Sequence, residues 1–565
     1  MHTDKKGIRL LVAICKAKGL KDIVISPGSR NAPLVIEFAR DGAFRCLVVP
    51  DERSAAFVAL GVAQQSGLPT AVICTSGSAP LNYSPALAEA YYQRIPLVAI
   101  TADRPAEWIG QVDGQAINQR GMFKNFVRRS VTLPQEPTDE ADFWYLQRIV
   151  SETLDIAMGP VKGPVHLNVP LREPLYKQEV AEEKVLKMPS SLKTESFLNN
   201  DVMEKLADEW NKCRRKMIIC GGLAPSNPVQ EILSKLIDEP SLIILTESTS
   251  NLFLNHSIAC IDRVLATISK KDEKEFTPDL LITLGGPVVS KKIKAFIRRH
   301  KPNHHWHLDP DELHIDTYQC LTYHIPLEPD VFLNQLTERI TPAISTYRKI
   351  WLDKDNIAEA AHKDYMVDLQ WSDMKVFESV LKYLPKGSDL QMGNSTPVRY
   401  IQLYKPFKQL NYFGNRGTSG IDGCVSTAVG AAISSKRLTT LIVGDMAFFY
   451  DTNGLWHHHV PANLRIILIN NGGGGIFRII EGPSSVPELE EYFETRHSFN
   501  AKNIAATFGL DYSSCASFNE LEELLPLLYI ETTKAGILEI FTPYEENANV
   551  LSSYFKFISN KSLQS

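Results

Sequence analysis

The sequence predicts an α/β protein made of three doubly wound parallel-sheet domains. Short apolar, β-branched runs alternate with Gly/Ser/Pro turns and helix-like stretches along most of the chain. This alternation is typical of parallel strands joined by crossover helices. The length of 565 residues would fill about three or four ordinary domains. We expect domains over residues 1–180, 195–350 and 365–565.

The composition is that of a folded protein, with 44% hydrophobic and 22% charged residues. A formal charge of −5 provides no global basic field for nucleic acid or an anionic membrane. No run reaches the ~18 apolar residues that a membrane span needs, and Met1 to Lys18 lack a signal-like apolar stretch. We therefore expect a cytoplasmic protein. Its nine scattered cysteines favour reduced thiols over a disulfide framework or a zinc site.

The first domain repeats one pattern of strand, turn and helix. Each apolar run leads into a turn, and ligands of such folds bind just beyond the carboxyl ends of the strands, so we expect these turns to line one edge. The runs are Ile23–Ser26, Cys46–Val49, Ala71–Cys74 and Leu97–Thr101, followed later by Val165–Val169. The charged stretch from Arg172 to Glu195 is predicted to be an interdomain linker.

The remaining two domains repeat the pattern. The middle domain resembles a Rossmann-type fold, but it lacks a G-x-G-x-x-G turn, so dinucleotide binding is not supported. Its strand candidates are Met217–Cys220, Leu242–Leu245, Leu280–Leu284 and His305–Leu308. A polar stretch around Asp353–Trp371 separates it from the third domain, whose strand candidates are Gln409–Phe413, Thr440–Val443, Arg465–Ile469 and Gly536–Phe541.

The sharpest chemical signal lies in the third domain. One predicted strand ends in Gly444-Asp445, and the next ends in Asn470-Asn471 followed by four glycines. The chain between them suffices for one crossover, so both ends should meet at one sheet edge. Carboxylate, carboxamide and backbone oxygens suit Mg²⁺, and glycines let a diphosphate approach the backbone. The alternative is an ordinary glycine-rich turn.

The run His457-His458-His459 suggests a second metal site. Consecutive residues on a helix point about 100° apart, so they cannot share an ion as an i, i+4 pair can. We interpret them as helix-surface or packing residues.

Glu52 is the candidate acid of the first domain. It follows the predicted strand Cys46–Val49 and begins a helix-like stretch. Acidic capping explains Asp51-Glu52 equally well at the local level, because carboxylates are favoured in a first helical turn.

Arginines and other polar side chains gather in or near predicted turns and helix starts. Several arginine forks in one site would bind substrates that bear several carboxylates, although a solvated surface position is commoner for any single arginine. The set comprises Ser29, Arg30, Arg104, Gln115, Lys291 or Lys292, Ser395, Arg399 and Arg416.

Whole motifs are more specific than these single residues. The pairing of Gly444-Asp445 with Asn470-Asn471 resembles the metal and diphosphate motif of thiamine-diphosphate enzymes, with Met446 where many members have glycine. Further motifs closely resemble the 2-succinyl-5-enolpyruvyl-6-hydroxy-3-cyclohexene-1-carboxylate synthase family of menaquinone biosynthesis. They are Ile25 to Arg30, Asp51 to Arg53, Thr75 to Ser78, Thr101 to Pro105, Gly114 to Ile117, Gly121 to Phe123, Gly393 to Ser395 and Asn415 to Gly423. Gly114 replaces a frequent Asn, and Gly472 shortens the family's Asn run.

The resemblance implies a cofactor site for thiamine diphosphate and Mg²⁺, with Mn²⁺ as a possible substitute. Asp445 and Asn471 would bind the metal through side chains and Gly473 through its carbonyl. Gly444 and Ile476 would also contact the cofactor. Glu52 would activate it through the aminopyrimidine ring, and Ile421 would hold its bent shape.

The resemblance also implies two substrates, 2-oxoglutarate and isochorismate, for a transferase that decarboxylates the first and adds the succinyl carbanion to the second. Ser395 and Arg399 would hold the succinyl carboxylate. Ser29 is a further substrate-binding candidate, and Arg416 would serve either substrate. The residues expected to face isochorismate are Arg30, Arg104, Gln115 and Lys291. Family members share each site between subunits, so a homodimer or homotetramer is expected.

Two alternatives remain at this point. Another thiamine-diphosphate enzyme, such as a 2-oxoacid decarboxylase or an acetolactate-synthase-like ligase, would share Glu52, Asp445 and Asn471 without needing the arginines. A non-catalytic binding protein on the same fold is the other class.

Overall fold

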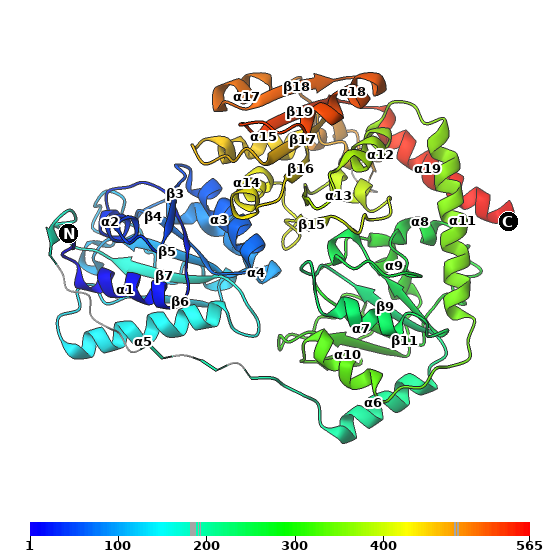
Figure 1. Cartoon of the computed structure of the whole chain (residues 1–565), viewed down its shortest axis with the longest axis horizontal. Coiled ribbons are helices and arrows are strands. Elements are labelled where there is room, and N and C mark those ends of the chain that lie inside the picture. Colours follow the sequence, from blue (N-terminus) through cyan, green and yellow to red (C-terminus); the bar gives the residue numbers. More distant parts are fainter. Residues whose placement is uncertain (181–187, 190, 193, 480–481, 483–484, 565) are drawn as a thin grey trace.

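The computed structural model describes residues 1–180, 188–189, 191–192, 194–479, 482 and 485–564. It contains three parallel sheets, one in each unit of the chain, and the predicted fold class is confirmed (Figure 1). The strand orders are β3-β2-β4-β5-β7-β6 in the N-terminal unit, β10-β9-β11-β12-β13 in the middle unit and β15-β14-β16-β17-β19-β18 in the C-terminal unit. We keep the domain limits 1–180, 195–350 and 365–565 as a proposal.

The N-terminal unit surrounds a sheet whose central strands are fully buried. Its strands are β2 (Asp22–Ile25), β3 (Arg45–Val48), β4 (Thr70–Cys74), β5 (Leu97–Asp103), β6 (Arg129–Thr132) and β7 (Val165–Pro170). Its helices are α1 (Lys6–Ala17), α2 (Ala32–Arg40), α3 (Glu52–Ser66), α4 (Ser84–Gln93) and α5 (Glu140–Ala157), with short 3₁₀ turns η1 (Pro80–Tyr83), η2 (Ala106–Trp108) and η3 (Lys124–Phe126). A separate antiparallel pair joins β1 (His2–Thr3) to β8 (Gln178–Glu179).

The middle unit has its own apolar core around a five-stranded sheet. Its strands are β9 (Lys216–Cys220), β10 (Leu242–Leu245), β11 (Leu280–Leu284), β12 (His304–Leu308) and β13 (Tyr323–Ile325). Its helices are α6 (Asn200–Lys212), α7 (Val229–Leu236), α8 (Ile261–Ala266), α9 (Lys291–Arg299) and α10 (Pro329–Thr337), with the 3₁₀ turn η4 (Ser248–Ser250).

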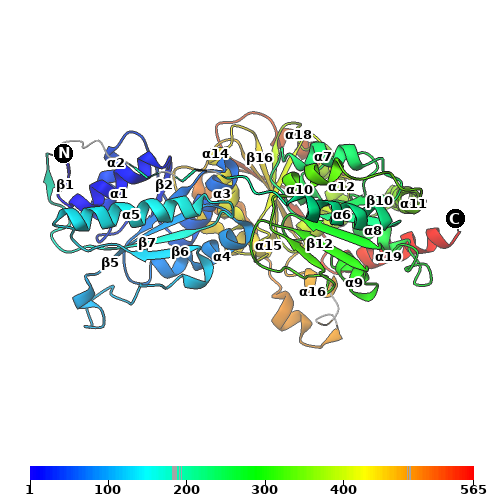
Figure 2. The same cartoon turned by 90° about the horizontal axis from the view of Figure 1, so that it is seen from below.

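The C-terminal unit carries the predicted metal motif. Its strands are β14 (Asp389–Met392), β15 (Asn411–Gly414), β16 (Thr439–Gly444), β17 (Leu464–Asn470), β18 (Asp511–Cys515) and β19 (Gly536–Phe541). Its helices are α11 (Tyr347–Val367), α12 (Asp373–Tyr383), α13 (Thr396–Ile401), α14 (Cys424–Ser434), α15 (Asp445–Tyr450), α16 (Ile476–Ile479), α17 (Lys502–Phe508), α18 (Phe518–Leu528) and α19 (Glu546–Gln564), with the 3₁₀ turn η5 (Thr452–Leu455) and the π-helix η7 (Leu489–Glu494). The segment around α16 projects from this unit (Figure 2).

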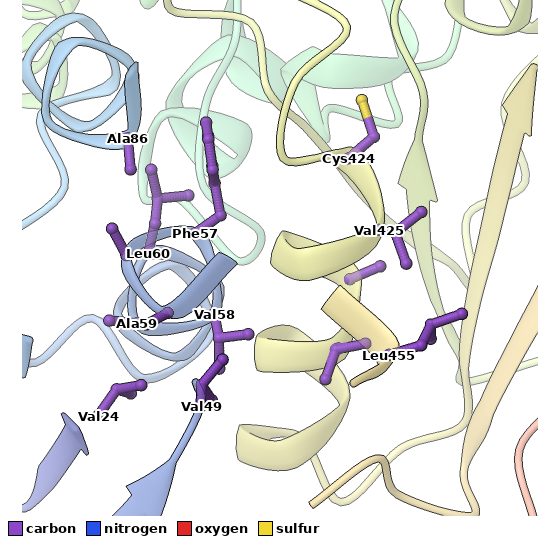
Figure 3. Close-up of a cluster of buried hydrophobic side chains, with 14 of the residues drawn as sticks. Val24, Val49, Phe57, Val58, Ala59, Leu60, Ala86, Cys424, Val425 and Leu455 are labelled. Atoms are coloured by element: carbon purple, nitrogen blue, oxygen red, sulfur yellow. The ribbon is translucent and has the colours of Figure 1, made fainter. Parts of the chain in front are cut away.

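One hydrophobic cluster joins the N-terminal and C-terminal units. Helices α3 and α14 cross between them, and side chains such as Phe57, Val425 and Leu455 belong to the same buried core (Figure 3). Glycines bring the two backbones together. A Cβ added at Gly61 would lie 2.1 Å from the Thr427 carbonyl oxygen, and one at Gly430 would lie 2.0 Å from that of Val58. The two units therefore meet across backbone-to-backbone contact that leaves no room for a methyl group.

Every strand proposed from the sequence is present, with ends shifted by at most two residues. The polar stretch around Asp353–Trp371 is largely helix α11, which packs on α8 of the middle unit and α19 of the C-terminal unit. The predicted linker Arg172 to Glu195 contains the short strand β8, and its residues 181–187, 190 and 193 lie outside the described residues.

The three consecutive histidines, His457 to His459, do not lie on a helix. The placement of His457 to His459 on a helix was wrong, because they form a turn in which the His459 Nε2 accepts a hydrogen bond from the Val48 N–H at 3.0 Å. All nine cysteines are free thiols, as expected. No helix within the described ranges is long and apolar enough to cross a membrane.

Candidate active site

The predicted metal motif lies at the carboxyl ends of two neighbouring strands. β16 and β17 pair in parallel, with Gly444 opposite Ile469. Asp445 begins α15 directly after β16, and its Oδ2 accepts hydrogen bonds from the N–H groups of Gly472 at 2.9 Å and Gly473 at 3.0 Å. The turn after β17 therefore folds onto the Asp445 carboxylate. The sequence expectation that both strand ends meet is correct.

Asn471 supplies the second side chain of this motif. Its Nδ2 donates to Asp373 Oδ2 at 3.2 Å, while its buried Oδ1 has no hydrogen-bond partner within the described residues. Burial raises the pKa of Asp373 to about 6. An unpartnered buried oxygen is costly unless it has a ligand, so the fixed Nδ2 leaves Oδ1 oriented for a cation.

The glycine turn supplies the remaining oxygen. The Gly473 carbonyl accepts from the Gly475 N–H at 2.9 Å, and a carbonyl has a second lone pair for another partner. Gly473 has φ +152°, and a Cβ there would lie 2.8 Å from the Glu494 carbonyl oxygen. Only glycine fits this position without a shift of the backbone. Carboxylate, carboxamide and carbonyl oxygens form a hard donor set that fits Mg²⁺ or Mn²⁺.

Two further predicted cofactor contacts flank the motif. Gly444 precedes α15, and a Cβ added there would meet nothing within 4 Å, so the backbone is open to a ligand on this side. Ile476 begins the short helix α16 after the glycine turn and is half-buried. Both residues border the same turn as Asp445 and Gly473.

Glu52 begins α3, as predicted, but it does not cap the helix. The cap is Asp51, whose side chain accepts from the backbone N–H groups of Arg53 at 2.8 Å and Ser54 at 3.2 Å. Burial raises the pKa of Glu52, a hydrogen bond with its own backbone opposes that rise, and the neighbouring Asp51 adds to it. Capping therefore explains Asp51 and leaves the Glu52 carboxyl for another task. A raised pKa suits a carboxyl group that exchanges protons near neutral pH.

Ile421 occupies the loop before α14 and packs partly against the core shared by the N-terminal and C-terminal units. Glu52 is the first residue of α3, and Ile421 shortly precedes α14. These are the two helices that cross at Gly61 and Gly430. Asp51, the cap of α3, contacts the 3₁₀ turn η5 that follows α15, because Asn453 Nδ2 donates to Asp51 Oδ2 at 2.6 Å. Asp445 stands at the opposite end of α15.

The first arginine pair lies at strand ends of the N-terminal sheet. Arg30, after β2, is buried and contacts Glu173 at 3.0 Å. Arg104, after β5, donates to the Gly114 carbonyl at 2.8 Å and lies 3.3 Å from Asp113. Burial lowers the pKa of Arg30, and the positive charge of Arg104 adds to that shift. Two guanidinium groups close enough to repel each other attract an anion between them.

The other predicted residues of this sheet lie around the same pair. Ser29 Oγ is 3.3 Å from the Tyr176 hydroxyl. The Gln115 carbonyl accepts from Ser76 Oγ at 2.9 Å, and Gln115 has φ +55°. This positive φ is uncommon for a side-chain-bearing residue, so the loop after Gly114 is held in a specific shape.

A second arginine pair lies in the C-terminal unit. Arg399 Nη1 donates to the Ser395 carbonyl at 2.6 Å, and Arg416 Nη1 donates to Asn394 Oδ1 at 2.7 Å. Burial lowers the pKa of Arg416, and the charge of Arg399 adds to it. The structure thus places Ser395, Arg399 and Arg416 close together.

The middle unit contributes charged groups that sequence reasoning missed. Burial lowers the pKa of Arg399, and Asp262 opposes that shift. Glu247, fully buried, accepts from the backbone N–H groups of Val289 at 2.7 Å and Ser290 at 2.8 Å. These bonds fix the start of α9, whose first residue is the exposed Lys291. Glu247 follows β10 closely, so the rule that functional residues follow strand ends would have singled it out.

Three family models match consecutive parts of the chain. The "Thiamine pyrophosphate enzyme, N-terminal TPP binding domain" matches residues 5–126, the "Middle domain of thiamine pyrophosphate" matches residues 190–391, and the "Thiamine pyrophosphate enzyme, C-terminal TPP binding domain" matches residues 391–537. Thiamine pyrophosphate is thiamine diphosphate under its older name. The fold and the oxygen-lined glycine turn therefore define a thiamine-diphosphate enzyme.

Similar proteins cover almost the whole chain. Proteins named 2-succinyl-5-enolpyruvyl-6-hydroxy-3-cyclohexene-1-carboxylate synthase are 44% identical in Flavobacterium johnsoniae (97% of this chain, 98% of that protein), 42% in Christiangramia forsetii (98% and 98%) and 40% in Porphyromonas gingivalis (99% and 98%). The chain belongs to this synthase family, and the resemblance seen in the motifs is confirmed. The match includes the middle unit, in which none of the motifs named above lies.

Proposed function

We propose that this chain decarboxylates 2-oxoglutarate with thiamine diphosphate and adds the resulting succinyl unit to isochorismate, giving 2-succinyl-5-enolpyruvyl-6-hydroxy-3-cyclohexene-1-carboxylate for menaquinone biosynthesis. The observation that carries the proposal is the match of almost the whole chain to proteins of this name, and the two arginine pairs, Arg30 with Arg104 and Arg399 with Arg416, agree with it. Two substrates that both bear carboxylates need two such sites. A decarboxylase of a small monocarboxylic 2-oxoacid needs neither.

The cofactor would be held by residues of the C-terminal unit. Asp445 and Asn471 would bind Mg²⁺ or Mn²⁺ through their side chains, and Gly473 would bind it through its carbonyl. Gly444 and Ile476 would contact the cofactor beside this metal. When bound, the thiazolium ring supplies the electron sink that makes loss of CO₂ feasible.

Glu52 and Ile421 would activate and support the bound cofactor. The Glu52 carboxyl would share a proton with the aminopyrimidine nitrogen, and burial, which raises the pKa of Glu52, favours that role. Ile421 would support the bent cofactor from below, because its side chain is only partly packed into the core.

The arginine pairs would divide the substrates between them. Ser395 and Arg399 would bind the distal carboxylate of 2-oxoglutarate. Arg416 is held beside Asn394 and would reach either substrate. The residues assigned to isochorismate are Arg30, Arg104, Gln115 and Lys291, and Ser29 is a further substrate-binding candidate.

Turnover assays with defined substrates test the function. The purified chain with thiamine diphosphate and Mg²⁺ should release CO₂ from 2-oxoglutarate, and isochorismate should divert the succinyl unit into the product, which mass spectrometry detects. Efficient turnover of pyruvate without isochorismate would instead identify a decarboxylase or an acetolactate-synthase-like enzyme. Absence of any cofactor-dependent turnover would favour a binding protein.

We also propose that the active form is a cytoplasmic homodimer or homotetramer, with Glu52 of one subunit acting on the cofactor held by Asp445 of another. The contact of Asp51 with Asn453 of η5, the turn that follows the end of α15 remote from Asp445, supports this sharing. Mixing the inactive variants Glu52→Gln and Asn471→Ala after mild dissociation should restore activity, because mixed dimers regain one intact site. No recovery, with subunit exchange verified by differently tagged chains, would place each site within one chain.

A further inference from the structure

Three side chains of metal-binding type converge in the middle unit, outside the cofactor site. His305 lies on β12, while Asp316 and Cys320 lie in the connection from β12 to β13. The His305 Nδ1 is 3.7 Å from Cys320 Sγ and 3.9 Å from Asp316 Oδ1, and all three ligand atoms lie within 4.8 Å of one another. One imidazole, one carboxylate and one thiol thus point at a common position.

The spacing of the three ligand atoms is close to that expected around one metal ion with tetrahedral coordination. Zinc bonds of about 2.0–2.3 Å to nitrogen, oxygen and sulfur place neighbouring ligand atoms about 3.4–3.6 Å apart. The separations from His305 exceed this range by a few tenths of an ångström. Small side-chain rotations would close that difference. A mixed nitrogen, oxygen and sulfur set favours Zn²⁺ over the hard ion Mg²⁺.

The hydrogen bonds behind His305 hold the ring in the orientation that a ligand needs. His305 Nε2 is 2.9 Å from Thr283 Oγ1, and the same hydroxyl is 2.7 Å from His307 Nδ1. If Thr283 donates to His307, it accepts the proton of His305 Nε2 and leaves the Nδ1 lone pair free for a metal. Metal-binding histidines are commonly fixed in this way through their second nitrogen.

The loop that carries the other two ligands is also held in place. Asp316 Oδ1 accepts from the backbone N–H groups of Cys320 at 2.8 Å and Leu321 at 3.1 Å. Thr322 closes the loop onto β12, since its N–H donates to the His305 carbonyl at 2.8 Å. Asp316 is exposed, Cys320 is half-buried and His305 is buried. The site therefore opens to solvent on the Asp316 side, where water would complete the coordination.

We propose that His305, Asp316 and Cys320 bind one Zn²⁺ ion that fastens the connection between β12 and β13 to the sheet of the middle unit. The sequence did not reveal this site because the three ligands follow none of the usual zinc-finger spacings. Three protein ligands with an open fourth position form a zinc site of the accessible type.

The test uses the full chain loaded with thiamine diphosphate and excess Mg²⁺, so that the cofactor site is filled. After treatment with a chelator and its removal, Co²⁺ is added as a spectroscopic substitute for Zn²⁺. A thiolate-to-cobalt charge-transfer band should appear in the near ultraviolet, and Zn²⁺ should abolish it at one equivalent per chain. Cys320→Ser should lack the band. Cys46→Ser is the matched control, because Cys46 is the other half-buried cysteine, and it should keep the band.

A second variant tests the hydrogen bonds behind the ligand. Thr283→Val retains the shape of the side chain but removes the acceptor for His305 Nε2, and Zn²⁺ affinity measured by competition with a coloured chelator should fall roughly 10- to 100-fold. Circular dichroism verifies that each variant is folded. The proposal is overturned if wild type shows no charge-transfer band, or if Cys320→Ser and wild type bind Zn²⁺ with equal stoichiometry and affinity.

Discussion

Replacing Gly430 with alanine is expected to destabilise the chain, although alanine is the better helix former. Gly430 lies inside α14, where propensity alone would favour alanine by about 1 kcal/mol. The added Cβ would lie 2.0 Å from the Val58 carbonyl oxygen, 2.8 Å from its carbon and 3.0 Å from its Cα. These are backbone atoms of α3, so no side-chain rotation relieves the overlap.

The overlap sets the size of the effect. Carbon and oxygen atoms need more than 3 Å between them, so α3 and α14 must separate by about 1 Å. Overpacking of a dense core costs about 1–3 kcal/mol and more where backbone must move. After subtraction of the propensity gain, we expect a net loss of about 2 kcal/mol. Such a loss lowers the main thermal transition by a few degrees.

Calorimetry of three variants provides the measurement. Gly430→Ala should lower the transition temperature, while Gly42→Ala should leave it nearly unchanged, because a Cβ at Gly42 meets nothing within 4 Å. Gly61→Ala would force apart the same two helices. The double variant Gly61→Ala/Gly430→Ala should therefore lose less unfolding free energy than the sum of the losses in the two single variants. A Gly430→Ala protein as stable as wild type, or strict additivity in the double variant, would refute the close crossing.

Three further perturbations follow from the site and its surroundings. Glu52→Gln should bind the cofactor with wild-type affinity, measured by calorimetry, but should turn over substrate about 100-fold more slowly or worse. Near-wild-type CO₂ release by this variant would contradict the catalytic role of Glu52. Arg399→Ala should raise the KM for 2-oxoglutarate by roughly 10- to 100-fold without weakening cofactor binding, and an unchanged 2-oxoglutarate response would contradict the assignment. Burial opposes ionisation of Asp309, but the neighbouring His307 and the hydrogen-bonded ion pair with Arg94 lower the pKa of Asp309 from 3.8 to about 2. The stability from this ion pair is therefore present above pH ~4 and lost as the pH falls toward 2. The difference in unfolding midpoint between wild type and Arg94→Gln should accordingly shrink over that range, and a constant difference would exclude the pair as its source.

The sequence was sufficient for the elements that are apolar along their whole length. Strands such as β10 and β11 read as uninterrupted buried runs, which is the pattern of a central parallel strand. β14 escaped notice although it is equally buried, because two of its four residues are polar. Gln391 donates to Gln64 Oε1 at 3.0 Å, and Asp389 accepts from Ser435 Oγ at 2.6 Å. Those partners are distant in sequence, so local patterning could not show why the strand tolerates polar side chains.

The candidate site likewise has residues that the sequence could place and residues that it could not. Asp445, Asn471 and the glycine turn could be placed from the chain alone, because adjacent parallel strands bring their carboxyl ends together. The contributions of Glu247 and Asp262 depend on how the middle unit docks beside Arg399 and Arg416, which is a tertiary relation. The sequence after Asp445 is helix-like, and for that reason we expected His457 to His459 on a helix. The helix α15 ends already at Tyr450, and the chain then turns.

The shared core around α3 and α14 also bears on how the chain is made. The ribosome completes α3 some 360 residues before it completes the start of α14, and at typical synthesis speeds this delay is roughly 20–70 s. During that interval the face of α3 around Phe57 and Gly61, which is buried in the finished protein, has no permanent cover. The nascent N-terminal unit therefore presents an apolar surface to the cell until the last third of the polypeptide emerges, and protection by a chaperone during synthesis is the natural counterpart of this architecture.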